Sequence, residues 1–457
     1  MLKRLPVGLQ TFRKLREGDY LYVDKTELIY RLITTGEVYF LSRPRRFGKS
    51  LLVSTLEEIF SGHRELFKGL WIYDADYDWE EHPVLRLNLD LERVRSVEEL
   101  EEFLVSYLGE IGWEMEIEVK PSAPQRMLRQ LIKGLARRKR VVVLVDEYDK
   151  PLIDNLENLE EAKRIREVLK GFYTVLKAMD EHLRFVLLTG VSKFSKAGVF
   201  SGLNNLNDIT LHRRYATLLG ITQEELEEYF DEHIGAFAAD VGLGREELLA
   251  RIREWYDGFC FAPNAPRVYN PHSLLMLFDT HRFANYWFET GTPTFLIKLL
   301  RERSLGLREI EDALLEEIEF SSYDIEALAV YPLLIQTGYL TIKGYDEGEQ
   351  VYRLSYPNRE VEVAFTKRLL EEFVGVEWED WRLYSERMVK ALAEGDMEGF
   401  FEVLDIFYGW IPYGVQLKSD GILSGVQNGR VKSGGGGRDA TGTDRCGGGG
   451  GEERVYF

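Results

Sequence analysis

The hydrophobic pattern of the first 220 residues alternates between strands and helices. Four nearly continuous apolar runs predict buried strands: "VYFLSR" (38–43), "VLRLNLD" (84–90), "VVVLVDEYD" (141–149) and "RFVLLTGV" (184–191). Between them, apolar residues recur at helical spacing over 48–60, 96–113, 124–138 and 157–180. Apolar strands separated by helices are typical of a parallel sheet that is covered by helices on both faces. The pattern therefore predicts an α/β domain over residues 1–220.

The pattern changes beyond residue 220. The sequence "TQEELEEYFDEH" begins with a capping box, in which Thr222 and Glu225 satisfy each other's backbone N–H groups. Strand signals are then absent over most of residues 221–330, which predicts a helical domain.

Residues 331–412 combine helices with a hairpin. A short helix is followed by two strand signals with the turn "GYDEGE" between them, and this order resembles a winged-helix module. More helices are predicted up to residue 412. Residues 413–457 are rich in glycine and have almost no apolar periodicity. Such a segment cannot bury enough surface to offset chain entropy, so we expect a disordered tail.

Composition narrows the classes of function. The chain has 457 residues and a formal net charge of −19, which counts against a protein that mainly grips nucleic acid. The basic run "ARRKR" (136–140) fits a solvated helix end or a local nucleic-acid contact. There is no membrane-length apolar run, no secretory signal, and no disulfide or zinc pattern around Cys260 and Cys446. These features predict a cytoplasmic protein with no membrane partner.

The stretch "YFLSRPRRFGKSLL" (39–52) joins the first strand to a helix and resembles a phosphate-binding loop. Gly48, Lys49 and Ser50 match the end of the pattern G-x-x-x-x-G-K-[ST], but Arg43 stands where the first glycine belongs. Such a loop works because N–H groups at a helix N-terminus converge on phosphate oxygens, while the lysine reaches the phosphates and the hydroxyl binds Mg²⁺. The alternative is that these residues open a helix by chance. The candidate nucleotide-binding residues are Arg43, Pro44, Arg45, Arg46, Phe47, Gly48, Lys49, Ser50 and Leu51.

The three arginines of the loop allow two interpretations. Their guanidinium groups could supply the electrostatic help that the missing glycine withholds, because arginine suits phosphate. They could instead form a solvated basic turn that pairs with acids of the chain. Pro44 has no N–H group to donate, so the cradle must differ in detail from the usual one.

Two acids follow the third predicted strand. Asp146 stands at its carboxyl end, where a nucleotide hydrolase holds the Mg²⁺ shell, and Glu147 comes next. A glutamate in that position could act as general base on the attacking water. Acids also end strands at the surface without any chemistry. Their combination with the lysine-bearing loop favours a nucleotide site, in which Ser50 and Asp146 are the metal candidates and Glu147 the catalytic candidate.

The end of the fourth strand, "LLTGVSK", supplies candidate sensors of the terminal phosphate. In sheets of this kind that strand lies beside the phosphate loop. Thr189, Ser192 and Lys193 are the polar residues at its tip, although polar residues are common at strand ends.

Several motifs together resemble the prokaryotic predicted AAA-ATPase-like family. These are "YLYVDKTELIYRLI", "YFLSRPRRFGKSLL", "VVVLVDEYDKPL", "LLTGVSKFS", "LNNLNDITL", "WYDGFCF" and "VYNPHSLL", in this order. The resemblance spans about residues 5–412. It implies a P-loop NTPase fold, and it implies that R-P-R-R-F-G-K-S is the usual phosphate loop of the family rather than a decayed one.

The resemblance also implies roles for single residues. Lys49 and Ser50 become the phosphate- and magnesium-binding pair, Asp146 the metal acid and Glu147 the base, with ATP and Mg²⁺ as the ligands. Members of the family commonly continue into a PD-(D/E)xK-type nuclease domain. Here the resemblance fades after "IPYGVQLKSD" (411–420), so we expect that domain to be missing.

Three functions stay open at this point. The leading hypothesis is a Mg²⁺-dependent ATPase whose turnover rearranges its domains. The second is a nucleotide-gated signalling or defence switch with little turnover, and the third is a nucleic-acid-binding module that uses the winged-helix-like region. The sequence does not name the protein or nucleic-acid partner, and a homo-oligomer is left open.

Overall fold

The computed structural model describes residues 2–193, 199–200, 202–287, 296, 299–300, 310, 313–316, 329–374 and 378–410. Its main sheet has five strands in the order β2-β3-β4-β1-β5, and every pair is parallel. The strands are β1 (Val38–Ser42), β2 (Val84–Asn88), β3 (Val141–Asp146), β4 (Leu183–Gly190) and β5 (Asn207–Asp208). The short β5 is the one strand of this sheet that the hydrophobic pattern does not predict. Because all strands are parallel, their carboxyl ends meet at one edge.

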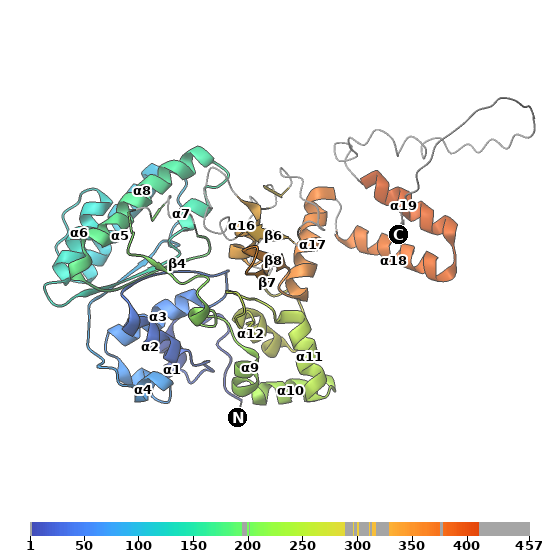
Figure 1. The fold of residues 1–457 in the computed structure, drawn as a ribbon, viewed down its shortest axis with the longest axis horizontal. Coiled ribbons are helices and arrows are strands. Elements are labelled where there is room, and N and C mark those ends of the chain that lie inside the picture. The colour runs from blue at the N-terminus through green and yellow to red at the C-terminus, as the bar shows by residue number, and fades with distance from the viewer. Residues whose placement is uncertain are drawn as a thin grey trace, which may run out of the picture. The chain divides into compact units, whose positions relative to one another are not determined.

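Helices cover both faces of this sheet (Figure 1). One layer consists of α5 (Val97–Glu114), α6 (Pro124–Leu135) and α8 (Leu159–Ala178), which contact one another. The other contains α1 (Phe12–Glu17), α2 (Thr26–Thr35), α3 (Lys49–Phe60) and α4 (Trp71–Asp74). Shorter elements are α7 (Lys150–Ile153) and the 3₁₀ helices η1 (Arg64–Phe67), η2 (Asp180–His182) and η3 (Arg213–Tyr215). The predicted α/β fold is confirmed.

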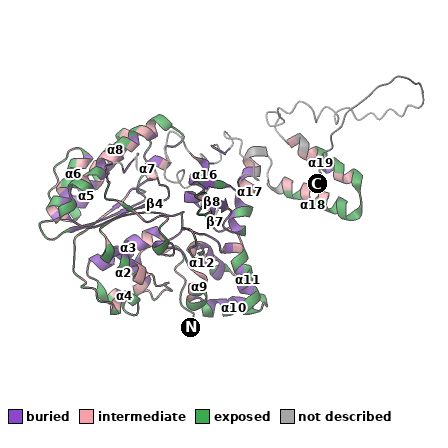
Figure 2. Ribbon diagram, in the orientation of Figure 1, coloured by how far each residue is buried: buried purple, intermediate pink, exposed green. Residues whose placement is uncertain are grey.

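Burial explains this layering. All six positions of β3 are buried, as the continuous apolar run predicts for a strand covered on both faces. Figure 2 shows the helices as mixed, with buried residues beside exposed ones. In α6, for example, Met127, Leu128, Leu131 and Ile132 are buried, at the spacing of one helical face.

A helical region follows the sheet. It contains α9 (Gln223–Tyr229), α10 (Asp231–Val241), α11 (Arg245–Tyr256) and α12 (Pro271–Thr280). The predicted capping box at the start of α9 is present, with both Thr222 and Glu225 accepting the expected N–H groups. A second hydrophobic cluster, which includes Phe230, Phe237 and Leu274, holds these helices together.

The next region has a helix, three antiparallel strands and a second helix. These are α16 (Val330–Thr337), β6 (Leu314–Glu316), β7 (Thr341–Asp346), β8 (Val351–Ser355) and α17 (Arg359–Val374), with the strand order β6-β8-β7. The predicted helix and hairpin are therefore present. The assignment of this region to the winged-helix class stays a prediction.

The chain divides into two compact units, Met1–Trp381 and Arg382–Phe457. The helix α18 (Trp378–Glu394) spans the boundary, and α19 (Met397–Trp410) lies in the second unit. The predicted disordered tail, 413–457, lies outside the described residues. The division into four domains at 220, 330 and 412 stays a prediction.

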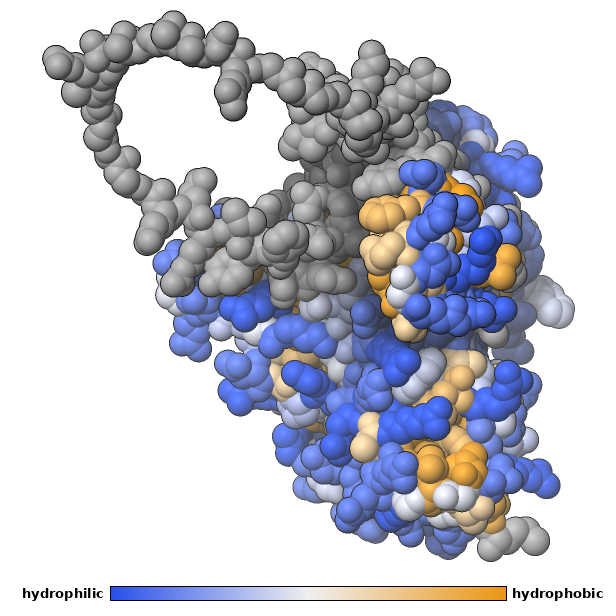
Figure 3. Space-filling view, turned by 90° about the vertical axis from the view of Figure 1, so that its right-hand side faces the viewer, coloured by the Kyte–Doolittle hydropathy of each residue, from blue (hydrophilic) through white to orange (hydrophobic). Residues whose placement is uncertain are grey.

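Most of the surface in Figure 3 is hydrophilic, with a few hydrophobic patches. Large apolar side chains of the second unit are among those exposed: Leu383, Val389, Leu392, Met397 and Phe401. Among the residues that the structure describes, no helix is both long enough and apolar enough to span a membrane.

Candidate functional site

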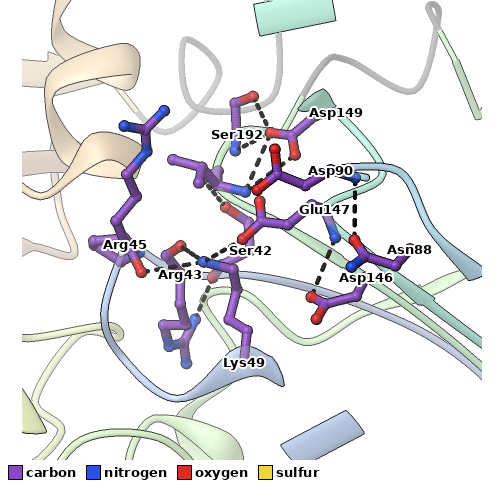
Figure 4. Close-up of polar contacts among 12 residues, drawn as sticks. Ser42, Arg43, Arg45, Lys49, Asn88, Asp90, Asp146, Glu147, Asp149 and Ser192 are labelled. Atoms are coloured by element: carbon purple, nitrogen blue, oxygen red, sulfur yellow. Dashed lines mark hydrogen bonds and ion pairs between the residues drawn. The ribbon is translucent and has the colours of Figure 1, made fainter. Parts of the chain in front are cut away.

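The phosphate loop runs from the end of β1 to the start of α3. Gly48 immediately precedes α3 with φ +91°, a left-handed conformation that glycine adopts without a steric cost. Lys49 is the first residue of the helix and is buried. Its Nζ donates to the carbonyl oxygens of Arg43 at 3.2 Å and Pro44 at 3.3 Å (Figure 4). The ammonium group is thus held inside the loop, beside the helix N-terminus.

Ser50 and Asp146 form a pair next to this lysine. Asp146 is the last residue of β3 and is 2% exposed. Burial raises the pKa of its carboxyl group, and the charge of Glu147 raises it further, whereas the hydrogen bond from Ser50 lowers it. Both side chains offer the oxygen ligands that Mg²⁺ prefers.

No cage for a metal exists in the described part of the chain, since no group of three His, Cys, Asp or Glu side chains there is placed to hold an ion. Mg²⁺ usually binds through one or two protein ligands, with water and phosphate oxygens as the others. The Ser50–Asp146 pair therefore fits a metal that arrives with a nucleotide.

Glu147 extends toward the same lysine. Its Oε1 lies 3.7 Å from Lys49 Nζ, and its backbone N–H donates to Asp146 Oδ1 at 3.1 Å. The residue has φ +52°, which is uncommon for a residue other than glycine, and such conformations cluster at functional sites. The backbone turn after β3 therefore separates the carboxylate of Glu147, which lies beside Lys49, from that of Asp146.

Lys49, Ser50 and Glu147 line a cavity of about 490 Å³, a volume within the usual range for small-molecule sites. Its polar wall includes Arg45, Arg46, Lys49, Ser50, Asp90, Glu147, Lys150 and His272. A smaller cavity of about 120 Å³ shares part of this lining, including Gly48, Leu51 and Pro271, and its other walls are mainly apolar. Charged and apolar walls therefore adjoin on the two sides of Gly48.

Arg43 does not face the cavity. Its guanidinium donates to the carbonyl oxygens of Ser42, Thr210 and Tyr215 at 2.7–3.2 Å and lies 4.1 Å above the ring centre of Phe261. Burial lowers the pKa of this group to about 9. The structure therefore does not support the expected phosphate contact by the Arg43 side chain, which belongs to the interior.

The other loop residues lie in two groups. Arg45, Arg46 and Leu51 line the cavity, and contact of the two arginines with phosphate stays a prediction. Pro44 and Phe47 are buried, and Phe47 lines the smaller cavity. Phe47 packs edge-on against Phe259 and Phe261, with ring centres 4.9 and 5.2 Å away.

The three sensor candidates differ in their contacts. The hydroxyl group of Thr189, in β4, is buried and has no hydrogen-bond partner among the described residues. Ser192 donates its N–H and its hydroxyl to Asp149 Oδ2, each at 2.6 Å. Lys193 forms an ion pair with Asp208 at 2.5 Å. Thr189 is thus the candidate whose side chain retains an unused polar group.

Asp149 is a site residue to which the sequence analysis assigned no role. It is fully buried and accepts N–H groups from Val191 and Ser192, which fixes the loop after β4 against the turn after β3. Burial raises the pKa of this carboxyl group to about 6, with the charge of Glu147 as the second cause. The third acid of "DEYD" was the available signal in the sequence.

Residues beyond position 220 also reach the phosphate loop. The carbonyl oxygen of Arg45 accepts from Asn270 Nδ2 at 3.5 Å and from Trp287 Nε1 at 3.2 Å. The Asn270 side chain also caps α12, because its Oδ1 accepts the N–H groups of His272 and Ser273. The motif "VYNPHSLL" thus places an asparagine that serves a helix and the loop together.

Known proteins match the same parts of the chain. The family described as "Predicted AAA-ATPase" matches residues 6–200, which include the phosphate loop and the ends of β3 and β4. A protein of Azotobacter chroococcum mcd 1, described as "Uncharacterized protein in vnfD 5'region", is 41% identical over 421 residues. The match covers 90% of this chain and 78% of that protein. This chain therefore belongs to the predicted AAA-ATPase family.

Proposed function

We propose that the protein binds ATP with Mg²⁺ and hydrolyses it. The observation that carries this proposal is that Lys49, Ser50 and Glu147 line one cavity at the carboxyl edge of a parallel sheet, with the buried Asp146 hydrogen-bonded to Ser50. This edge is where open α/β sheets bind their ligands. The family adds ATP as the expected nucleotide.

The phosphates would bind at the start of α3. There, backbone N–H groups and the helix dipole favour an anion, and Lys49 can exchange its two carbonyl contacts for phosphate oxygens. The apolar cavity on the other side of Gly48 would accept the base, since it shares Leu51 and Pro271 with the charged one. One ligand could therefore occupy both cavities.

Ser50 and Asp146 would hold the metal. A Mg²⁺ ion held there would supply positive charge against the phosphate oxygens while the phosphoryl group passes to water. Glu147 would orient and deprotonate that water, and the contact between its carboxylate and Lys49 would give way to phosphate. Thr189 would donate its unused hydroxyl to the terminal phosphate.

ATP hydrolysis by the full chain tests the proposal. We expect Mg²⁺-dependent release of phosphate by the parent, strongly reduced release by Lys49→Ala and by Glu147→Gln, and retained ATP binding in Glu147→Gln. Binding can be measured by equilibrium dialysis. Unchanged turnover in either variant would contradict the proposed roles.

The same experiment distinguishes a nucleotide-gated switch. The contact between Glu147 and Lys49 favours this second function if it persists when nucleotide is bound, because the base would then be held away from water. ATP binding that is abolished by Lys49→Ala, without turnover in the parent, would identify the switch.

A further inference from the structure

Three segments from distant parts of the chain contact the phosphate loop at Pro44, Arg45 and Phe47. Asn270 and Trp287 both donate to the Arg45 carbonyl oxygen, across 225 and 242 residues of sequence. Phe47 packs against the two phenylalanines of "WYDGFCF". The loop is thus attached to the helical region by hydrogen bonds and by ring contacts.

The third segment is the end of α16. Gly338 has φ +89°, and a Cβ atom there would lie 2.8 Å from Pro44 Cβ and 3.1 Å from Trp287 Cζ2. A side chain at this position would therefore push against both the loop and the tryptophan that holds it. The close approach requires glycine.

One buried carboxylate links the two donors. Glu360, in α17, is fully buried. Its Oε1 accepts the backbone N–H of Trp287 and its Oε2 accepts the hydroxyl of Ser273, each at 2.8 Å. Ser273 lies in the first turn of α12, which Asn270 caps. A shift of α17 would therefore move both side chains that donate to the Arg45 carbonyl oxygen, those of Asn270 and Trp287.

The loop needs contacts from other segments because its own residues do little to stabilise its conformation. It has Arg43 in place of the first glycine, Pro44 supplies no N–H group, and Arg46 has φ +66°. A residue other than glycine in this conformation costs free energy and persists where the surroundings impose it. Contacts from outside the loop can supply what an opening glycine supplies elsewhere.

We propose that Asn270 and Trp287 are positioning residues of the phosphate loop, and that Glu360 couples their position to the hairpin region, so that nucleotide binding and the placement of α17 depend on each other. This inference rests on the proposed nucleotide site. Each lost hydrogen bond should weaken nucleotide binding about three- to tenfold, the usual range for one neutral hydrogen bond.

The experiment compares four variants of the full chain with the parent. Trp287→Phe keeps an aromatic ring but loses the indole N–H. Asn270→Ser keeps a side chain that caps helices well, yet is too short to reach Arg45. Glu360→Gln leaves one acceptor oxygen, so it cannot accept from both Trp287 and Ser273. Trp113→Phe is the matched control, because Trp113 lies in α5 and its side chain is 84% exposed.

The measurements are the dissociation constant of ADP with Mg²⁺, by equilibrium dialysis, and the change in tryptophan emission on ADP addition. We expect weaker ADP binding in the first three variants, no change in Trp113→Phe, and loss of most of the emission change in Trp287→Phe alone. Thermal unfolding checks that each variant is folded. A purely structural role would lower the melting temperature and leave the dissociation constant and the emission change intact.

The outcomes separate the two proposals. If the parent binds neither ADP nor ATP, the proposed function fails, and this inference with it. If the parent binds ADP and the folded Trp287→Phe and Asn270→Ser variants bind it equally well, the inference alone is overturned. If Trp287→Phe and Asn270→Ser bind ADP more weakly but Glu360→Gln binds it as tightly as the parent, the coupling to α17 is overturned.

Discussion

Glu147, which follows Asp146 at the end of β3, lines the same cavity as the phosphate loop after β1, but different contacts hold the two acids and the loop. Asp146 ends a strand that pairs along its length with β2 and β4, and its register partner is Asn88. The loop instead receives side chains from Asn270 and Trp287. The acids therefore depend on the backbone ladder of one sheet, whereas the loop depends on long-range tertiary contacts.

This difference separates two kinds of control. The parallel sheet is buried and rigid, so Asp146 and Glu147 should keep their places when other parts of the chain move. The loop would follow a displacement of α12 through Asn270, and one of α17 through Trp287, whose N–H group Glu360 accepts. Binding of nucleotide should thus be sensitive to the helical and hairpin regions, and the chemical step to the end of β3.

The largest expected effect lies on the side of the acids. Glu147→Gln should lower the turnover of ATP about 10²–10⁴-fold, the range for a lost general base, and leave the dissociation constant near that of the parent. Steady-state phosphate release and equilibrium dialysis measure the two quantities. A variant that loses binding and keeps its turnover per bound nucleotide would reverse the comparison.

Gly190→Ala is a second test of the segment after β3 that carries Asp146 and Glu147. The added Cβ would lie 2.2 Å from Asp149 Oδ1, a buried carboxylate that cannot easily move. We expect the free energy of unfolding to fall by about 3 kcal/mol and the turnover to fall more than the affinity for ADP. Urea denaturation measures the first effect. Gly109→Ala is the control, because the same atom meets nothing within 4 Å there.

The corresponding test of the loop side is Gly338→Ala. The added Cβ would press on Pro44 in a backbone conformation with φ +89°. We expect the free energy of unfolding to fall by about 1–2 kcal/mol. In contrast to Gly190→Ala, the affinity for ADP should fall more than the turnover at saturating ATP. Equal effects of the two variants on both quantities would remove the distinction between the two sides.

The smallest expected effect is a pH dependence of stability from Asp149. Its pKa is raised to about 6, above the ordinary carboxyl value, so the folded state binds a proton that the unfolded state has lost. This contribution to stability is present at low pH and is lost as pH rises through about 6. Asp149→Asn should lack that slope between about pH 4 and pH 6. Urea denaturation at several pH values measures it, and an equal slope in both proteins would exclude Asp149 as its source.

Part of the site could be predicted from the sequence because several of its residues directly follow a strand along the chain. The apolar run 141–145 predicts a buried strand, and Asp146 and Glu147 follow it directly. Lys49 and Ser50 are predicted in the same way, because they begin a helix after a strand. The inward position of Arg43 was missed, since a cation in a loop sequence resembles a phosphate ligand whichever way it points.

The sequence by itself determined the parallel sheet, the helical layers and the neighbouring chemical groups at Lys49, Ser50, Asp146 and Glu147. These follow from hydrophobic periodicity and from residue order, both of which act over a few residues. Only the tertiary structure decided which side chains hold the loop and which face the cavity. Asn270, Trp287 and Glu360 meet the loop region from far along the chain, and no local pattern encodes a contact made between segments that folding brings together.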